Sequence, residues 1–408
     1  MKCKLLLSAA LLSASFFSNA QSASKTYAIT GKANNNFLWA DIKQVDITSG
    51  KVNKTLFESD KTAFKMTNLD KTVVASKGID NSPTGLGVAA CALDTRHNRL
   101  YFATMHFSDI RFLDLDKDEA NFTTIKTNII AKGSNTGYQP EENHITRMVI
   151  AADGYGYALT NDANHLIRFS TAKNPVVMDL GNLIDAESNK TISIHNKCSS
   201  WGGDMVADAF GKLVVISASH NVFMVDINSR IASLKGSISG LPANFTTNGA
   251  AVDDDGSLVV SSANVFEGLY KVNMKDLSAV KVPGKEPAFN ASDLANGNFL
   301  SQKEANDITR YNPTKLGIPG TGEAKVYPNP LPAGSQVNVA FEDQPAGKYT
   351  IVLTDIAGRA FQSKAVIISK TGQVVTMRLT GKTSSGMYLV KILNEKKQLA
   401  FSDKIVIN

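Results

Sequence analysis

Three side chains that carry oxygen atoms each come just before an apolar, strand-like segment: Asn143, Asp204 and Asn248. His144 and Asn290 have comparable positions. Amide and carboxylate oxygens are the ligands that hard cations such as Ca²⁺ prefer. If the segments surround one axis, these oxygens converge on it. The simpler interpretation is a polar channel that holds water; the alternative is a site for calcium or another divalent cation, the one cofactor that the sequence suggests.

Other motifs that could carry chemistry each lack a required residue, so no catalytic residue is assigned. The run DLDKDE from Asp114 has Glu119 where a calcium loop requires glycine. The run GSISG has Ile238 where a nucleophile elbow requires serine. The run DDDG from Asp253 is typical of a soluble turn. The six histidines are scattered without an HExxH motif, and we expect each to be structural.

The elements that must position these side chains are repeated hairpins. Four segments share an apolar strand, an aspartate, a polar or glycine turn and a second apolar strand, with the aspartates at Asp94, Asp153, Asp208 and Asp253. Aspartate and glycine tolerate the backbone angles of tight turns, which favours a β-hairpin in each copy. The run ASDLANGNFLSQ is a fifth, weaker copy.

A third strand-like element follows each hairpin and ends in Asp, Ser or Asn at position 46, 114, 170, 226, 273 or 312. A small antiparallel unit cannot bury both of its faces, but a ring of such units can. The pattern predicts a β-propeller over residues 21–315, most simply with six blades. Five and seven blades remain alternatives, because the first and last units are poorly defined.

The first twenty residues have the pattern of a secretory signal peptide. Lys2 and Lys4 precede an apolar run, and small residues lead to an expected cleavage between Ala20 and Gln21. Without the signal segment the formal charge falls from +6 to about +4. No lysine or arginine block is interleaved with aromatics, which argues against a nucleic-acid partner. No other stretch is long and apolar enough to span a membrane.

Two cysteines remain beyond the signal segment, Cys91 and Cys198. An exported chain can oxidise such a pair to a disulfide. The commoner fate of cysteine is burial as a small apolar residue, and we expect both to lie buried in separate strands.

A second domain follows a linker rich in proline and glycine at residues 316–323. Residues 324–408 contain about seven short alternating segments separated by turns such as Ser385-Gly386. This density of strands predicts a small immunoglobulin-like β-sandwich. Pro328 and Pro330 hold the residues before them in extended conformations and set a rigid entry to the first strand.

This second domain resembles the C-terminal sorting domain of the type IX secretion system of the Bacteroidetes. The resemblance rests on four groups in order: VYPNPL, TDIAGRAF, GMYLVKI and a terminal DKIVIN. The residues that match its pattern are Tyr327, Pro328, Asn329, Pro330, Asp355, Gly358, Gly386, Tyr388, Lys391 and Lys404. The resemblance implies passage through the Sec translocon, then recognition by the outer-membrane machinery and delivery to the cell surface or the medium.

Two classes of function remain for the propeller. The hairpins are similar to those of NHL-type and gluconolactonase-type propellers, some of which hold a divalent cation and open lactones. The chain shares that rhythm without an identifiable set of ligands. The sequence therefore favours a non-enzymatic module that binds a glycan, a peptide or a protein. The alternative is a metal-assisted hydrolase, lactonase or lyase that uses the central channel.

Overall fold

The computed structural model describes residues 24–305 apart from 34–35, 75–81, 86, 106–108, 128, 130–139 and 285–286, and residues 324–407 apart from 333, 343, 356–358, 371, 381–385, 396 and 398. Tertiary contacts divide the chain between Gln302 and Lys303 into two compact units. The expected signal segment with Ala20 and Gln21, the linker 316–323 and Gly358 lie outside the described residues.

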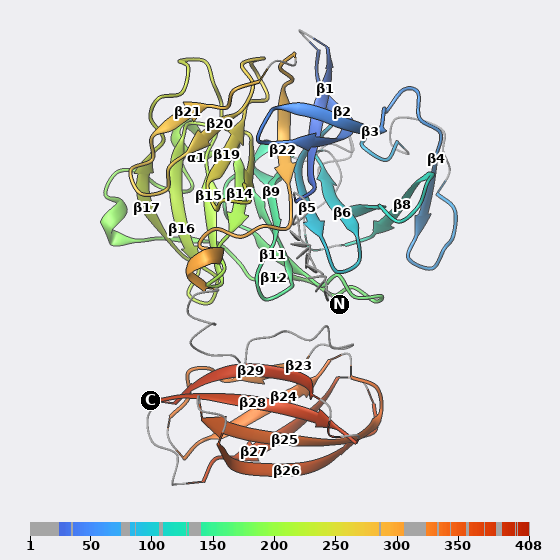
Figure 1. Ribbon diagram of the computed structural model, residues 1–408, viewed down its shortest axis with the longest axis vertical. Coiled ribbons are helices and arrows are strands. Elements are labelled where there is room, and N and C mark those ends of the chain that lie inside the picture. The colour runs from blue at the N-terminus through green and yellow to red at the C-terminus, as the bar shows by residue number, and fades with distance from the viewer. Residues whose placement is uncertain are drawn as a thin grey trace, which may run out of the picture. The chain divides into compact units, whose positions relative to one another are not determined.

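The first unit contains five antiparallel sheets (Figure 1). In each sheet the strands follow one another from the inside of the unit to its outside. They comprise β1 (Thr26–Ala33), β2 (Asn36–Asp46) and β3 (Lys51–Phe57) with β22 (Ala291–Ala295); β5 (Val88–Asp94), β6 (Arg99–Thr104), β7 (Ile110–Asp114) and β8 (Ala120–Ile125); β9 (Ile145–Ile150), β10 (Gly156–Thr160), β11 (Leu166–Phe169) and β12 (Val177–Asp179); β14 (Asp204–Ala207), β15 (Lys212–Ile216), β16 (Asn221–Asp226) and β17 (Ile231–Ser237); and β18 (Gly249–Val252), β19 (Leu258–Ser261), β20 (Tyr270–Val272) and β21 (Ala279–Lys281).

Two short strands extend these sheets in parallel, and three short helical turns lie in the connections. The strands are β4 (Phe64–Asn68), which pairs with β8, and β13 (Ile184–Asp185), which pairs with β17. Among the described residues, the turns in the connections are η2 (Glu141–Asn143), η3 (Glu187–Asn189) and α1 (Lys197–Ser200). Residues 302–305, after β22, are also helical. Among the described residues, no helix is long and apolar enough to cross a membrane.

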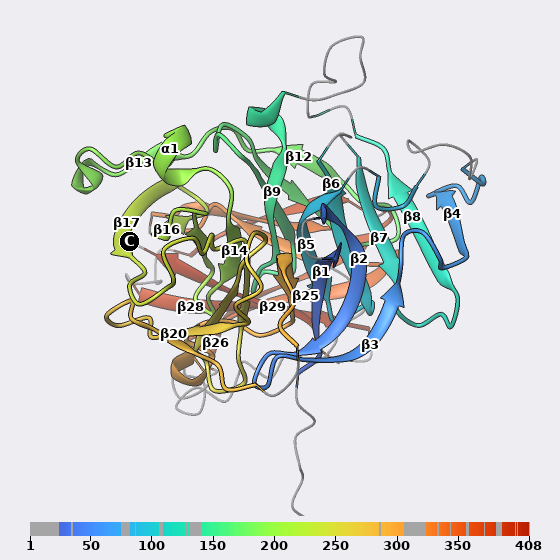
Figure 2. The ribbon, with the colours of Figure 1, turned by 90° about the horizontal axis from the view of Figure 1, so that it is seen from above.

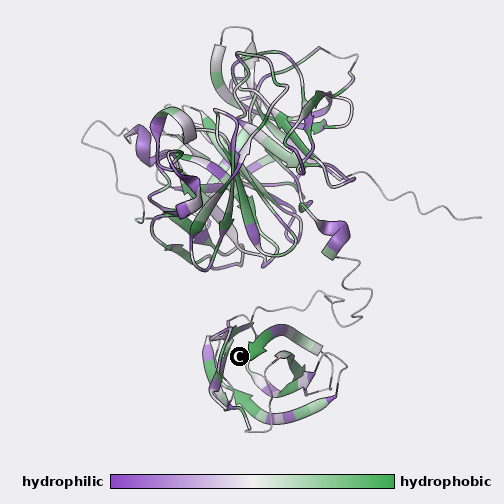
Figure 3. Cartoon of the chain, turned by 90° about the vertical axis from the view of Figure 1, so that its left-hand side faces the viewer, coloured by the Kyte–Doolittle hydropathy of each residue, from purple (hydrophilic) through white to green (hydrophobic). Residues whose placement is uncertain are grey.

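The five inner strands form a closed ring. β22 lies against β5, β5 against β9, β9 against β14, β14 against β18, and β18 against β22. Figure 2 shows β5, β9 and β14 near the middle of this unit, with β4, β8 and β17 towards its outside. The unit is therefore a β-propeller, as predicted. Apolar residues lie along its strands (Figure 3).

The prediction of six blades is wrong for the described residues, which form five. The run ASDLANGNFLSQ is not a hairpin of its own, because its strand β22 pairs with β1 from the start of the chain. The first and last repeats are thus the two parts of a single blade, and counting each as a unit adds one blade. The third element that was expected to end at Asn312 lies outside the described residues.

The second unit is a β-sandwich of seven described strands, as predicted. One sheet has the order β23 (Ala324–Tyr327), β24 (Gln336–Phe341) and β27 (Gln373–Arg378). The other has the order β26 (Ala360–Ile368), β25 (Gly347–Asp355), β28 (Gly386–Asn394) and β29 (Leu399–Ile407). Alternate residues of both sheets, such as Val339 and Ile351, are fully buried between them. Each strand therefore has one core face and one outer face.

Candidate functional site

Two carboxyl groups lie buried where the inner strands of the propeller meet. Asp204 begins β14 and Asp293 lies in the middle of β22, and both side chains are 0% exposed. Asp204 accepts hydrogen bonds from the backbone N–H groups of Met205 at 2.6 Å and Ala250 at 2.5 Å. The thiol of Cys91 donates to Asp293 Oδ1 at 2.8 Å. These contacts join four of the five inner strands.

The two carboxyl groups share a hydrogen bond, and burial raises the pKa of each well above its usual range. Oδ2 of Asp293 has no donor among the described residues, so a proton on that atom lets it donate to Asp204. Asp204 already accepts two backbone N–H groups, which favour its charged form. The geometry therefore places the shared proton on Asp293 and the negative charge on Asp204.

Arg147 is a buried cation that interacts electrostatically with Asp204. It projects from β9, is 0% exposed, and burial lowers the pKa of its guanidinium to about 10. It donates to the backbone oxygens of Gly202 and Thr160 at 3.0 Å each, and to that of Ser200. Its charge attracts that of Asp204. Arg147 thereby ties the segment before β14 to the neighbouring blade.

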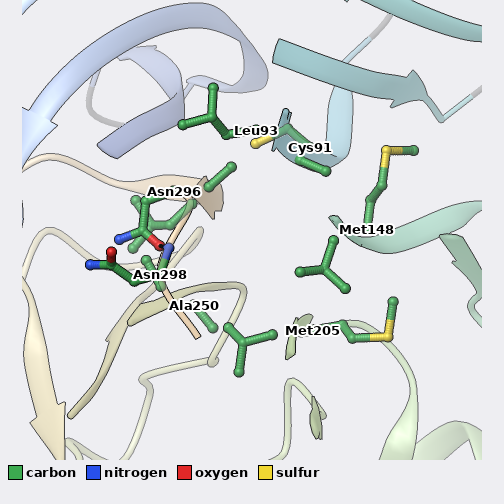
Figure 4. A pocket seen from close by; sticks show the side chains of 13 residues that line it. Cys91, Leu93, Met148, Met205, Ala250, Asn296 and Asn298 are labelled. Carbon is green, nitrogen blue, oxygen red and sulfur yellow. Dashed lines mark hydrogen bonds between the residues drawn. The ribbon is translucent and has the colours of Figure 1, made fainter. Parts of the chain in front are cut away.

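A cavity of about 10 Å³ lies among the inner strands. Figure 4 shows Cys91, Met148, Met205 and Ala250 around it, with the amides of Asn296 and Asn298 at one side. Such a volume is about that of one water molecule. This cavity therefore has no room for a ligand larger than water.

The three predicted metal ligands lie at or just before neighbouring inner strands. Asn143 ends η2, and Asp204 is bound to β18 through Ala250. Asn248 Oδ1 accepts hydrogen bonds from Ala263 N–H at 3.1 Å and from the Thr246 hydroxyl. Within the described ranges no cluster of three or more His, Cys, Asp or Glu residues could hold an ion. Calcium at these oxygens stays a prediction.

The two cysteines are free thiols. Cys91 is buried, as expected. Cys198 is exposed in α1, and the prediction of a buried strand residue is wrong for it. Its helical turn belongs to a long connection between the third and fourth blades, which the repeat pattern does not describe.

The same connection holds a polar surface cluster that the sequence analysis missed. The ring of the half-buried Trp201 donates from Nε1 to His195 O at 3.0 Å. The Lys197 ammonium lies 4.9 Å from the centre of that ring and 2.6 Å from Glu141 Oε2 on the loop before β9. We call Glu141, Lys197 and Trp201 the α1 cluster. A tryptophan among polar residues in SSWGGD, between two hairpins, was the available signal.

The matched residues of the second unit divide into structural and exposed groups. Asn329 donates from Nδ2 to Lys404 O at 2.7 Å and accepts from Val406 N–H at 2.8 Å, so it covers the edge of β29. Asp355 binds Arg359 Nε at 2.7 Å at the end of β25. Tyr388 is buried against Phe361 with ring centres 5.6 Å apart.

The remaining matched residues lie at the entry to the first strand and on one sheet face. Tyr327, Pro328 and Pro330 are exposed beside Asn329, and Gly386 starts β28 with a φ of +154° that favours glycine. Lys391 and Lys404 lie on neighbouring strands of the outer face, because Leu389 is opposite Lys404 and Ser402 is opposite Lys391.

Comparison with known families identifies the second unit. Residues 325–408 match the model of the secretion system C-terminal sorting domain. The match confirms the resemblance that the four sequence groups indicated. It shows that the type IX secretion system delivers this chain to the cell surface or the medium. Among curated proteins, none matches the chain.

Solved structures with some likeness to the chain include PorZ, an essential surface component of the type IX secretion system of Porphyromonas gingivalis, at 14% identity and a TM-score of 0.30. That match covers 94% of this chain and 51% of PorZ, so the chain spans about half the length of PorZ. Virginiamycin B lyase from Staphylococcus aureus is 9% identical with a TM-score of 0.29, over 79% of this chain and 85% of the lyase. A protein from Lactobacillus plantarum is 9% identical with a TM-score of 0.32, over 94% of this chain and 97% of its own.

Proposed function

We propose that the propeller is a non-enzymatic binding module that the sorting domain carries to the cell surface. The match of residues 325–408 to the sorting domain carries the export part of this proposal. For the propeller, the support is the packing of its centre, where two buried acids, the buried Arg147 and a cavity of about 10 Å³ lie among the inner strands.

The α1 cluster is the binding surface that we propose for a glycan, a peptide or a protein. It combines an indole ring and a carboxylate that each lie within 5 Å of the same ammonium group, that of Lys197. Tryptophan and charged groups together provide apolar contact area and hydrogen bonds, which favours recognition of polar ligands. The propeller would then act as a rigid base for this surface.

Export is tested by deleting residues 325–408 and following the chain by cell fractionation in a host with a type IX system. We expect the shortened chain to accumulate folded in the periplasm, because the ring of inner strands closes without the second unit. Surface display equal to that of the full chain would overturn the proposal.

Binding and metal dependence are tested on the purified mature chain by thermal unfolding in the presence of glycans, calcium or a chelator. We expect a glycan or peptide ligand to raise the melting temperature, and Trp201→Ala to remove the rise, measured against the unliganded melting temperature of that variant. A rise in excess calcium that Asp204→Ala abolishes would instead favour the cation prediction and the metal-assisted alternative.

A further inference from the structure

The net positive charge of this chain comes entirely from its sorting domain. Residues 325–408 contain eleven lysines and arginines against five aspartates and glutamates, a net charge of +6. The 324 residues before them contain thirty-two of each sign. The domain that the secretion system recognises therefore carries the whole excess, which favours an acidic partner.

Part of this charge lies on one outer face of the sandwich. We call Val352, Met387, Leu389, Lys391, Lys404 and Val406 the basic sheet face. Val352 is opposite Lys391, Leu389 is opposite Lys404, and Met387 is opposite Val406, so all six residues share the side of the sheet that faces away from the core. Met387 is 47% exposed. The face combines apolar residues with two ammonium groups.

The acids of the domain do not neutralise this face. Glu342 pairs with Lys325, Asp355 with Arg359, and Glu395 with Lys348. Asp403 is next to Lys404 in the strand, so its side chain points to the opposite side of the sheet. Among the described residues, neither Lys391 nor Lys404 has an ion-pair partner within the chain.

We propose that the basic sheet face docks onto an acidic protein surface of the secretion machinery, with Lys391 and Lys404 as the charged contacts. This inference rests on the export function proposed above and adds to it the contact surface and the charge of the partner. A complementary charge pattern steers two proteins together and sets their register, while the exposed Met387 and the partly exposed Val352 and Val406 supply apolar contact area.

A protein fits this face better than an anionic membrane does. Recognition of anionic lipid headgroups requires clusters of about four to eight basic residues. The face has two lysines among four apolar residues, which suits a shaped partner surface with acids at fixed positions.

The test is charge reversal in the full-length chain, expressed in a host with a type IX system. We expect Lys391→Glu with Lys404→Glu to lower the surface-exposed fraction about tenfold or more, since like charges facing each other in an interface are strongly unfavourable. The double Lys→Arg variant should be exported as the native chain is. Lys370→Glu is the matched control, because Lys370 is exposed in the turn after β26 and away from the face.

Melting curves of each purified variant establish that the sandwich still folds. Native-level export of the folded double Glu variant would overturn the docking face. The export proposal is tested separately: it stands if deletion of residues 325–408 blocks export. Loss of export by Lys370→Glu as well would point to total charge rather than this face. Binding of the native chain to vesicles with anionic lipid, lost in the double Glu variant, would overturn the protein partner in favour of a membrane.

Discussion

At the scale of single residues, the protonated Asp293 makes the stability of the propeller depend on pH. Burial raises its pKa in the folded chain above the value of about 3.9 in an unfolded chain. Above pH 4 the unfolded chain therefore binds fewer protons than the folded one, and the free energy of unfolding falls as pH rises. The slope is about 1.4 kcal/mol per pH unit until the folded pKa is passed.

Asp293→Asn tests this assignment. The amide keeps an oxygen for the Cys91 thiol and can donate to Asp204, so it imitates the protonated acid. We expect urea unfolding of the native chain to show lower stability at pH 8 than at pH 5, and the variant to lose most of that difference. The expectation fails if both proteins have the same pH profile.

Single residues were also where prediction from sequence was weakest. Asp204 was singled out because it precedes an apolar segment, but its partner Asp293 and the Cys91 thiol bound to Asp293 are 89 and 113 residues away and carry no local signal. Only the closure of the ring brings these three side chains together. Trp201 was missed for a similar reason, because the Lys197 ammonium over its ring pairs with Glu141, which lies 56 residues earlier in the chain than Lys197.

At the scale of elements, Asn329 links the Pro-Asn-Pro segment to the last strand of the sandwich. Its side chain makes two hydrogen bonds to the backbone of β29. We expect Asn329→Ala to lower the free energy of unfolding of the sorting domain by about 2 kcal/mol, since each bond contributes about 1 kcal/mol. Asn338→Ala is the matched control, because Asn338 accepts one bond from Thr376.

Calorimetry of the full chain measures both variants. A loss for Asn329→Ala no larger than that for Asn338→Ala would show that the Pro-Asn-Pro segment is not needed to hold β29.

The closing strand β22 is the second element with a clear energetic role. It completes the first blade by pairing with β1, and Ser292 donates to Val88 O of the next blade at 2.7 Å. We expect a chain of residues 24–305 to unfold cooperatively and a chain of residues 24–290 to be aggregated or molten, because the ring remains open. Circular dichroism and thermal melts of the two chains provide the comparison, and equal melting temperatures would contradict this role.

At the scale of the whole molecule, the two units have separate cores and are joined by a segment rich in glycine and proline. Arg310 and Lys315, just before this segment, are sites for trypsin. We expect brief digestion of the folded chain to cut there before it cuts within either unit, leaving two stable fragments. Mass spectrometry of the first products is the measurement, and early cuts inside the propeller would contradict it.

The sequence by itself determined the all-β class, the hairpins around Asp94, Asp153, Asp208 and Asp253, and the sorting domain. These features depend on local alternation, turn chemistry and short motifs, which can be recognised wherever they occur in a chain. For example, β5 ends at Asp94 and β6 begins at Arg99, on the two sides of the predicted turn.

Tertiary structure alone decided the number of blades and the content of the axis. Pairing between β1 and β22 joins segments that are more than 250 residues apart, and local patterns do not encode which distant edges meet. The shared proton of Asp204 and Asp293 follows from that same closure, since two acids become neighbours and lose water only when the ring is complete. Likewise, Lys391 and Lys404 form one face because strand register places them on the same side of a sheet.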